Sequence, residues 1–203
     1  MSRDIVEKFD ADPFILFDQW FDEAKTKEIN DPNAVYVATS DADGMPSVRT
    51  VLLKAHDHHG FVFYTNCNSI KGHALQDNPK AEMLFHWKSL ERQIRIAGAV
   101  ETVDDEEADA YFATRHPDSQ IGAWASIQSR PIEHRDDLKK REAQYREKFK
   151  GVEAIPRPPH WTGFRVIPKR MEFWIAGEFR LHTRFVYERR NGGVAWQINW
   201  LYP

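Results

Sequence analysis

The residues best suited to chemistry are cations that lie among apolar neighbours. Arg49 and Lys54 flank the run TVLL, whose composition is typical of a half-buried strand. Buried or half-buried cations need an anionic or aromatic partner. On an ideal strand, residues 49 and 54 project from opposite faces. We therefore expect this one strand to contact two different anions.

A third cation, Lys71, lies at the start of a short predicted helix, where backbone N–H groups and the helix dipole favour a phosphate. Thr65 and Ser69 add hydroxyl groups close by in the chain. With Arg49 they would form a mixed cradle of cations and hydroxyls, which suits a phosphate of about −1.5 to −2 charges. Taken one at a time, these residues are more often ordinary members of ion pairs.

Tyr111, Arg115 and Ser119 follow one another at four-residue steps, which would align them on one helical face if the chain did not turn at Pro117. Together with Lys54 they offer a second phosphate site. The competing interpretation is that Tyr111 packs in the core and Arg115 caps the end of a helix. Spacing alone favours that competing interpretation.

The run EFRLHTRF resembles an extended segment with Arg180, His182 and Arg184 on one side. Alternating cations are poor core formers, whereas a planar guanidinium stacks well on aromatic rings. We therefore expect this segment to cover a heteroaromatic ligand.

Three histidines, His56, His58 and His59, cluster in the run AHDHHG. The run is typical of a polar hairpin turn and has no supporting ligand set in its neighbourhood, so we expect no metal there. The single Cys67 cannot form an intrachain disulfide and is expected to be a reduced thiol. The motifs GxGxxG, GxSxG and HExxH are missing, which removes the common dinucleotide loops, hydrolase elbows and zinc proteases.

Composition places the chain among ordinary globular proteins. Its 203 residues are 41% hydrophobic, enough for a substantial core in one domain. A formal charge of −3 gives no field that would attract nucleic acid or an anionic membrane. The N-terminal run lacks the apolar core of a secretory signal, so we expect a cytoplasmic protein, with residues 1–12 as a flexible segment.

Helices and strands must position these residues. The pattern predicts helices at about 13–29, 69–77, 105–115, 118–125 and 133–150, the last polar on nearly all sides. It predicts an antiparallel meander of three runs within 34–66, then strands at 81–87, 92–103, 161–168, 170–177, 184–190 and 194–202, with a hairpin turn at 191–193.

This order of elements predicts an α+β fold: a closed or nearly closed β-barrel decorated by helices, in one domain spanning 1–203. A barrel of this size fills its interior with side chains, so a large ligand would bind outside it or in a groove between subunits. We therefore expect an oligomer.

Several motifs resemble the pyridoxamine 5′-phosphate oxidase family: RTVLLK, FYTN with Ser69 and Lys71, ERQIRIAG, YFATRHPDSQIGAWAS, EFW and RLHTRF. They occur in colinear order from about Asp12 to the C-terminus. The resemblance implies a split β-barrel flavoprotein that is a homodimer, with two FMN sites at the subunit interface.

The resemblance also assigns roles to individual residues. Those matching FMN-binding positions are Arg49, Thr50, Val51, Leu52, Lys54, Tyr64, Thr65, Ser69, Lys71 and Gln93 from one subunit, and Gln128, Ser129, Trp174 and Arg184 from the partner subunit. Those matching the substrate-phosphate site are Lys54, Tyr111, Arg115 and Ser119. Arg180 and His182 match the pair over the pyridine, and we assign them to positioning and charge stabilisation.

The implied reaction is oxidation of pyridoxamine or pyridoxine 5′-phosphate to pyridoxal 5′-phosphate, with O2 as acceptor and H2O2 as product. The cofactor carries the difficult chemistry, and the protein mainly holds two rings in register. Two alternatives stay open: a related flavin oxidase acting on another aromatic metabolite such as a phenazine precursor, and a non-catalytic protein that binds FMN or vitamin B6 phosphates.

Four features depart from the family pattern. Ile70 stands where many members carry an Arg, which removes one phosphate contact. Thr183 replaces an Asp and could alter how Arg180 and His182 are held. Trp200 replaces an Arg near the C-terminus, which bears on accessory binding, and the short N-terminus lacks a basic, Tyr-containing extension.

Overall fold

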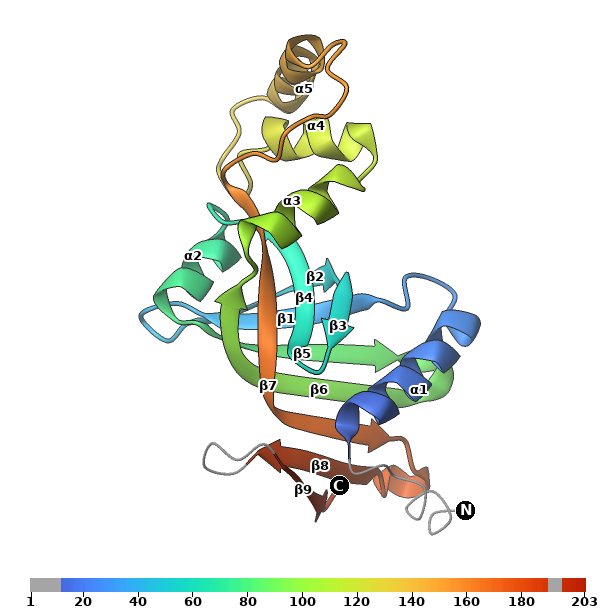
Figure 1. The fold of residues 1–203 in the computed structure, drawn as a ribbon. Helices are drawn as coiled ribbons and strands as arrows, with labels where there is room; N and C mark the ends of the chain where they lie inside the picture. The colour runs from blue at the N-terminus through green and yellow to red at the C-terminus, as the bar shows by residue number, and fades with distance from the viewer. Residues whose placement is uncertain (1–11, 190–194) are drawn as a thin grey trace.

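A curled antiparallel sheet forms the body of the molecule in the computed structural model, which describes residues 12–189 and 195–203 (Figure 1). Its strands are β1 (Ala34–Ser40), β2 (Pro46–Leu52), β3 (Ala55–Asp57), β4 (Gly60–Asn66), β5 (Lys80–Trp87), β6 (Arg92–Thr102), β7 (Trp161–Ile175), β8 (Thr183–Arg189) and β9 (Trp196–Leu201). The main path of the sheet runs β2-β1-β5-β6-β7-β4-β3, and β8 and β9 continue from β7. The predicted α+β class with a barrel-like antiparallel sheet is confirmed.

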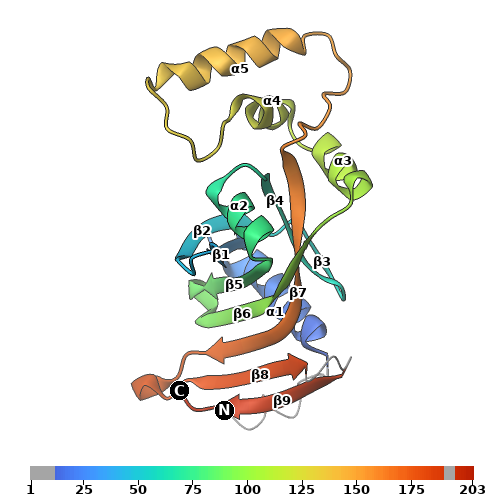
Figure 2. The same cartoon turned by 90° about the vertical axis from the view of Figure 1, so that its left-hand side faces the viewer.

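Helices surround this sheet. They are α1 (Pro13–Lys27), α2 (Ile70–Asp77), α3 (Asp105–Ala113), α4 (Pro117–Ala125) and α5 (Asp136–Lys148), with 3₁₀ turns η2 (Lys88–Leu90) and η3 (Glu178–Arg180). In both views α3, α4 and α5 lie at one end of β7, and β8 and β9 lie at the other (Figure 2). No helix in the described ranges has both the length and the apolar character needed to cross a membrane.

Strand β7 is one continuous element, whereas the sequence pattern predicted two strands. It pairs with β6 along 164–175, and on its other edge with β4 and then with β8. The register against β6 shifts between Ala97 and Gly98, opposite Pro168, so a bulge absorbs the proline and the strand continues. Gly98 is required there because a Cβ atom would lie 1.8 Å from the Ile167 carbonyl oxygen.

The predicted three-run meander is wrong in one respect that matters for the site. β2 ends at Leu52, and β1 pairs with β2 and β5, while β4 pairs with β3 and β7. Between the two hairpins the Leu53 N–H donates to the Asn33 carbonyl (2.8 Å) and the Lys54 N–H to the Val62 carbonyl (2.9 Å). Lys54 therefore lies beyond the strand that carries Arg49, and the prediction of opposite faces on one strand fails.

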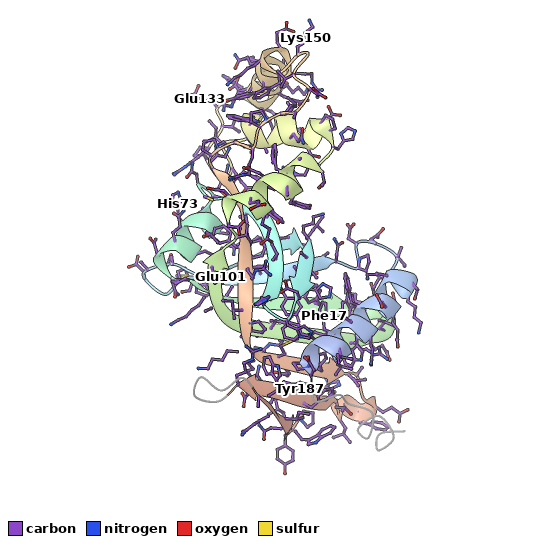
Figure 3. All side chains as sticks on the ribbon, viewed as in Figure 1. Phe17, His73, Glu101, Glu133, Lys150 and Tyr187 are labelled. Atoms are coloured by element: carbon purple, nitrogen blue, oxygen red, sulfur yellow. The ribbon has the colours of Figure 1, made fainter. Side chains whose placement is uncertain are left out.

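Helix α1 begins where the sequence predicts. Asp12 caps it by accepting a hydrogen bond from the Phe14 N–H (2.9 Å), and Pro13 occupies the first turn. Phe17 is fully buried, and its ring packs edge-on against Phe61 and Phe85. In Figure 3 the Phe17 side chain lies among the crowded side chains of the molecular body. These aromatic contacts fix the helix over the barrel.

Helix α5 confirms the prediction of a solvated helix, because none of its residues is buried. Glu133 and Lys150 mark this outer end of the molecule in Figure 3. The helix contacts α4 through Trp124, whose ring lies 5.7 Å from that of Tyr145. The α4–α5 pair thus forms a projection beyond the sheet.

The alternation in sequence predicted an extended segment around Arg180, and this prediction is wrong. Residues Glu178–Arg180 form a 3₁₀ turn in which Phe179 (φ 54°) and Arg180 (φ 66°) both have left-handed backbone. Such conformations cost about 1–3 kcal/mol for residues other than glycine and concentrate at functional sites. A Cβ atom at Gly177 would lie 2.1 Å from the Leu181 carbonyl oxygen, so the turn closes tightly on itself. The predicted hairpin turn at 191–193 and most of the predicted flexible segment lie outside the described residues.

Candidate active site

A cavity of about 840 Å³ opens between β2, β4, α2 and the α3–α4 corner. It gathers thirteen of the residues predicted from the sequence: Arg49, Thr50, Val51, Leu52, Lys54, Tyr64, Thr65, Lys71, Tyr111, Arg115, Ser119, Gln128 and Ser129. Segments 80 residues apart in sequence thus meet at one site. The cavity also has wall residues that sequence reasoning did not assign to a ligand: Ser47, Val48, Ile70, His116 and Trp161.

Arg49 is held by neutral oxygens. Its guanidinium donates to the Val37 carbonyl (3.1 Å), to Thr39 Oγ1 (2.8 Å) and to Ser47 Oγ (2.6 Å). Burial lowers the pKa of Arg49, and no carboxylate in the described ranges pairs with it. The side chain is therefore oriented by its neighbours while its charge stays uncompensated.

Lys71 lies in a similar setting and is buried. Its Nζ donates to Thr65 Oγ1 (2.8 Å), to Gln128 Oε1 (3.0 Å) and more weakly to Ser69 Oγ (3.4 Å). Burial, followed by repulsion from Arg49, lowers the pKa of Lys71 to about 8. An anion entering the cavity would relieve both effects, so this pair of cations is suited to bind one.

Ser69 does not line the cavity but supports it. The Ser69 side chain caps α2 by accepting from the Gly72 N–H (3.2 Å), and it donates to the Asn66 carbonyl (2.7 Å). A Cβ atom at Gly72 would lie 2.1 Å from the Cys67 carbonyl oxygen, so the turn that brings Lys71 into place needs glycine. The Ser69 side chain thus holds the start of the helix that carries Lys71, and its predicted contact with the cofactor stays a prediction.

A stack of aromatic rings forms the wall between β4 and α3. Tyr64 and Tyr111 are nearly parallel with ring centroids 4.1 Å apart, and Tyr64 lies 5.1 Å from Trp161. Burial, followed by the charge of Glu107, raises the pKa of Tyr64 to about 12, so its hydroxyl stays protonated. Arg115 lies over the Trp161 ring, 4.8 Å from its centroid.

Five predicted residues lie away from this cavity, at the far end of β7. Gln93 pairs with Trp174 across β6 and β7, and Trp174 pairs with Arg184 across β7 and β8. The His182 ring lies 4.6 Å from the Trp174 ring. Arg180, in η3, belongs to the same region. We call Gln93, Trp174, Arg180, His182 and Arg184 the distal cluster.

The sequence motifs predict that Gln128 and Ser129 contact FMN from the partner subunit, and this stays a prediction. Both line the cavity of their own chain, and Gln128 accepts a hydrogen bond from Lys71 of that chain. The loop after α4 folds back over α2, which places them there. Ser129 takes left-handed backbone (φ 68°) at this point.

The histidine cluster of the β3–β4 hairpin has structural partners. His56 Nε2 lies 2.6 Å from the Asp18 carboxylate, and its ring stacks near Phe61. Across residues 12–189 and 195–203, no group of three or more His, Cys, Asp or Glu side chains has the arrangement of a metal site.

Comparisons with known proteins agree with this geometry. The family model described as pyridoxamine 5′-phosphate oxidase matches residues 21–175, and that of the pyridoxine 5′-phosphate oxidase C-terminal dimerisation region matches 161–203. A protein of Caulobacter vibrioides named pyridoxine/pyridoxamine 5′-phosphate oxidase is 56% identical over 194 residues, covering 96% of this chain and 86% of that protein. One of the same name from Rhodospirillum rubrum is 54% identical over 199 residues, covering 96% and 98%.

Among solved structures, PhzG from Burkholderia lata 383, in complex with tetrahydrophenazine-1-carboxylic acid, is 32% identical with a TM-score of 0.90, covering 97% of this chain and 95% of that one. A pyridoxamine 5′-phosphate oxidase-related, FMN binding protein from Nostoc punctiforme is 17% identical, covering 91% and 96%, and shares the fold with a TM-score of 0.70. The split-barrel fold predicted from the sequence motifs is confirmed. Family models over most of the chain and relatives above 50% identity together show that the protein belongs to the pyridoxamine 5′-phosphate oxidase family.

Proposed function

We propose that this protein oxidises pyridoxamine 5′-phosphate, pyridoxine 5′-phosphate or both to pyridoxal 5′-phosphate, using FMN and O2. The observation that carries the proposal is the cavity with two groups of cations whose charges no described carboxylate neutralises. Arg49 and Lys71 form one group, and Lys54 and Arg115 form the other. Two cation groups suit two phosphates, one on the cofactor and one on the substrate.

The residues around Lys71 suit the phosphate of FMN. A buried ammonium with only hydroxyl and amide partners gains a charged partner when a phosphate binds, and Arg49 gains the same. FMN, when bound, supplies the two-electron redox chemistry that converts the C4′ amine or alcohol to an aldehyde and passes the electrons to O2. For the amine, substrate, O2 and water then give aldehyde, ammonia and H2O2.

The distal cluster lies away from the cavity of its own chain, so it would reach a bound ligand only in the cavity of a second subunit. The match to a dimerisation region supports a homodimer. We propose that the distal cluster of each protomer completes the cavity of its partner, so that FMN binds at the interface. Symmetry supports this arrangement, because a two-fold axis gives both cavities the same partner surface.

Arg180 and His182 would position the pyridine ring. The Gly177 N–H donates to His182 Nδ1 (3.2 Å), so the neutral imidazole carries its proton on Nε2. His182 then presents a hydrogen-bond donor to the substrate, while Arg180 offers a planar cation for stacking. Holding the two rings in register can supply a large part of the rate acceleration.

The PhzG structure makes oxidation of a phenazine precursor the second candidate, since that relative shares 32% identity and binds a tetrahydrophenazine acid. The cavity favours the phosphorylated substrate, because Lys54, Arg115, Tyr111 and Ser119 together would have little use without a phosphate. A protein that binds FMN without turnover is the third candidate, and a cytoplasmic location stays a prediction.

One experiment separates the three candidates. The purified protein is denatured to release and identify its chromophore, and peroxide is measured with pyridoxamine 5′-phosphate, pyridoxamine and a dihydrophenazine acid. We expect bound FMN and peroxide formation that is fastest with the phosphorylated compound. Faster turnover of the phenazine compound would support the second candidate, and bound flavin without peroxide would support the third.

A further inference from the structure

Trp161 is a cavity residue to which neither the sequence motifs nor the proposed chemistry gives a role. It opens β7 directly after the Pro-rich connector, and its side chain is buried. The Arg115 guanidinium lies over this ring at 4.8 Å and is 5.6 Å from the Phe112 ring centroid. Two aromatic faces therefore surround the one cation at the α3–α4 corner.

The described residues leave one hydrogen-bond donor of the Arg115 guanidinium without a partner. Its Nη1 is buried and has no hydrogen-bond partner, and no carboxylate of the described residues forms an ion pair with it. Burial lowers the pKa of Arg115, as expected for a desolvated cation. A planar guanidinium on an indole face keeps its edge N–H groups free, so they can bind an anion bidentately.

The surrounding structure fixes the position of both partners. Gln120 Nε2 donates to the Phe112 carbonyl (2.9 Å), which ties α4 to the end of α3. Arg157 Nη1 donates to the Trp161 carbonyl (2.7 Å), and the same guanidinium pairs with Asp105 (2.6 Å) and Asp109 (2.5 Å) of α3. Helix α3 and the first residue of β7 therefore hold Arg115 and Trp161 at a constant separation.

We propose that Trp161 is a positioning residue that holds the Arg115 guanidinium for the phosphate of the substrate, and thereby sets the preference for phosphorylated over unphosphorylated substrate. The inference rests on the proposed function for the identity of the phosphate ligand. Trp161 acts through Arg115 and does not itself contact the reacting carbon. The stack with Tyr64 keeps the indole plane fixed, and Gly163 makes room for it, since a Cβ there would lie 2.7 Å from the Tyr64 ring.

The test compares Trp161→Leu, Trp161→Phe and Arg115→Lys in the flavin-loaded enzyme, with active sites counted from bound FMN. In Trp161→Leu we expect kcat/KM for pyridoxamine 5′-phosphate to fall about tenfold and that for pyridoxamine to stay within about twofold. Trp161→Phe should recover most of the loss, because a flat ring remains. In the Arg115→Lys background, Trp161→Leu should add little further loss.

Trp124→Leu is the matched control, because Trp124 also has a cation over its ring (Lys148 Nζ, 5.1 Å) but is only half-buried and lies outside the cavity. It should leave the ratio of the two kcat/KM values unchanged. Equal losses with both substrates in Trp161→Leu, or full additivity with Arg115→Lys, would overturn the proposal.

Equilibrium binding keeps this test separate from the proposed function. Pyridoxal 5′-phosphate and pyridoxal are titrated against the same variants, and Trp161→Leu should weaken only the phosphorylated ligand, again about tenfold. If the wild type oxidises neither substrate but Trp161→Leu shows this selective loss of binding, the proposed function fails and the role of Trp161 stands. Unchanged binding of the phosphorylated ligand would reject the role of Trp161.

Discussion

Two regions rich in cations lie toward opposite ends of β7, and they differ in whether carboxylates of the protein pair with those cations. Around Glu172, one region includes Arg184 of the distal cluster. The Glu172 carboxylate is only 2% exposed and accepts from Arg184 Nη2 (2.7 Å) and Arg170 Nη2 (2.8 Å), with Arg95 Nη1 at 3.4 Å. In the cavity, Arg49 and Lys71 have only neutral partners. One region is internally neutralised and the other is not.

The difference lies in which group compensates the positive charge: a buried carboxylate of the protein does so around Glu172, and no described carboxylate does so in the cavity. Burial alone would raise the pKa of Glu172, but hydrogen bonds from Arg184 and Arg170 outweigh it and lower the pKa. In the cavity, burial lowers the pKa of both Arg49 and Lys71, and no carboxylate within residues 12–189 and 195–203 opposes it. Uncompensated cations of this kind are candidates for binding an anionic ligand, which is the role proposed above for Arg49 and Lys71.

The largest expected effect comes from breaking the neutralised region. Glu172→Gln leaves three arginines around a neutral amide, and we expect the free energy of unfolding to fall by about 3 kcal/mol. Urea denaturation measures this loss. The control is Glu188→Gln, which removes a more exposed partner of Arg170 and should cost less than about 1 kcal/mol. Equal losses in the two variants would contradict the distinction between the regions.

Removing a cavity cation should instead weaken ligand binding and spare stability. For Lys71→Met we expect FMN affinity to fall about 30-fold, because a charge-assisted hydrogen bond contributes about 2 kcal/mol. The unfolding free energy of the flavin-free protein should stay within about 1 kcal/mol of wild type. Flavin fluorescence titration and urea denaturation measure the two quantities. Lys80→Met, at an exposed strand position outside the cavity, should change neither, and a large stability loss in Lys71→Met would show that Lys71 is structural.

The smallest effect is a pH dependence of FMN affinity. The pKa of Lys71 is lowered to about 8, so its ammonium is present below that pH and is lost above it. Between pH 7.5 and 9.5 we expect the FMN dissociation constant to rise about tenfold. Over the same window the flavin-free protein should gain stability, because unfolded Lys71 binds a proton that the folded state has released.

Lys71→Arg is the matched variant for the pH dependence, since a guanidinium stays charged throughout this range. Its FMN affinity should be flat between pH 7.5 and 9.5. Tyr64 does not titrate there because its pKa is raised to about 12. The same slope in Lys71→Arg and in wild type would assign the pH dependence to another group.

Local patterns predicted most of the elements. The cap at Asp12 and Pro13, the helix after Ser69 and the polar helix α5 lie within a few residues of their expected positions. Errors occurred where neighbours in space decided the outcome. β7 continues past Pro168 because a bulge at Lys169 restores its pairing with β6. The turn at Phe179 and Arg180 forms because the chain closes tightly at Gly177.

For the candidate site too, the sequence predicted one part and the tertiary structure decided the other. Residue types and motifs in the sequence identified the cations and their family, since a charge in an apolar run is visible without coordinates. The tertiary structure alone showed that Lys54 lies off the strand of Arg49, that Gln128 contacts Lys71 in its own chain, and that the distal cluster lies apart. The tertiary structure also places Trp161 beside Arg115, 46 residues away in sequence. The energy of this cation–π contact depends on the distance in space and not on the separation along the chain.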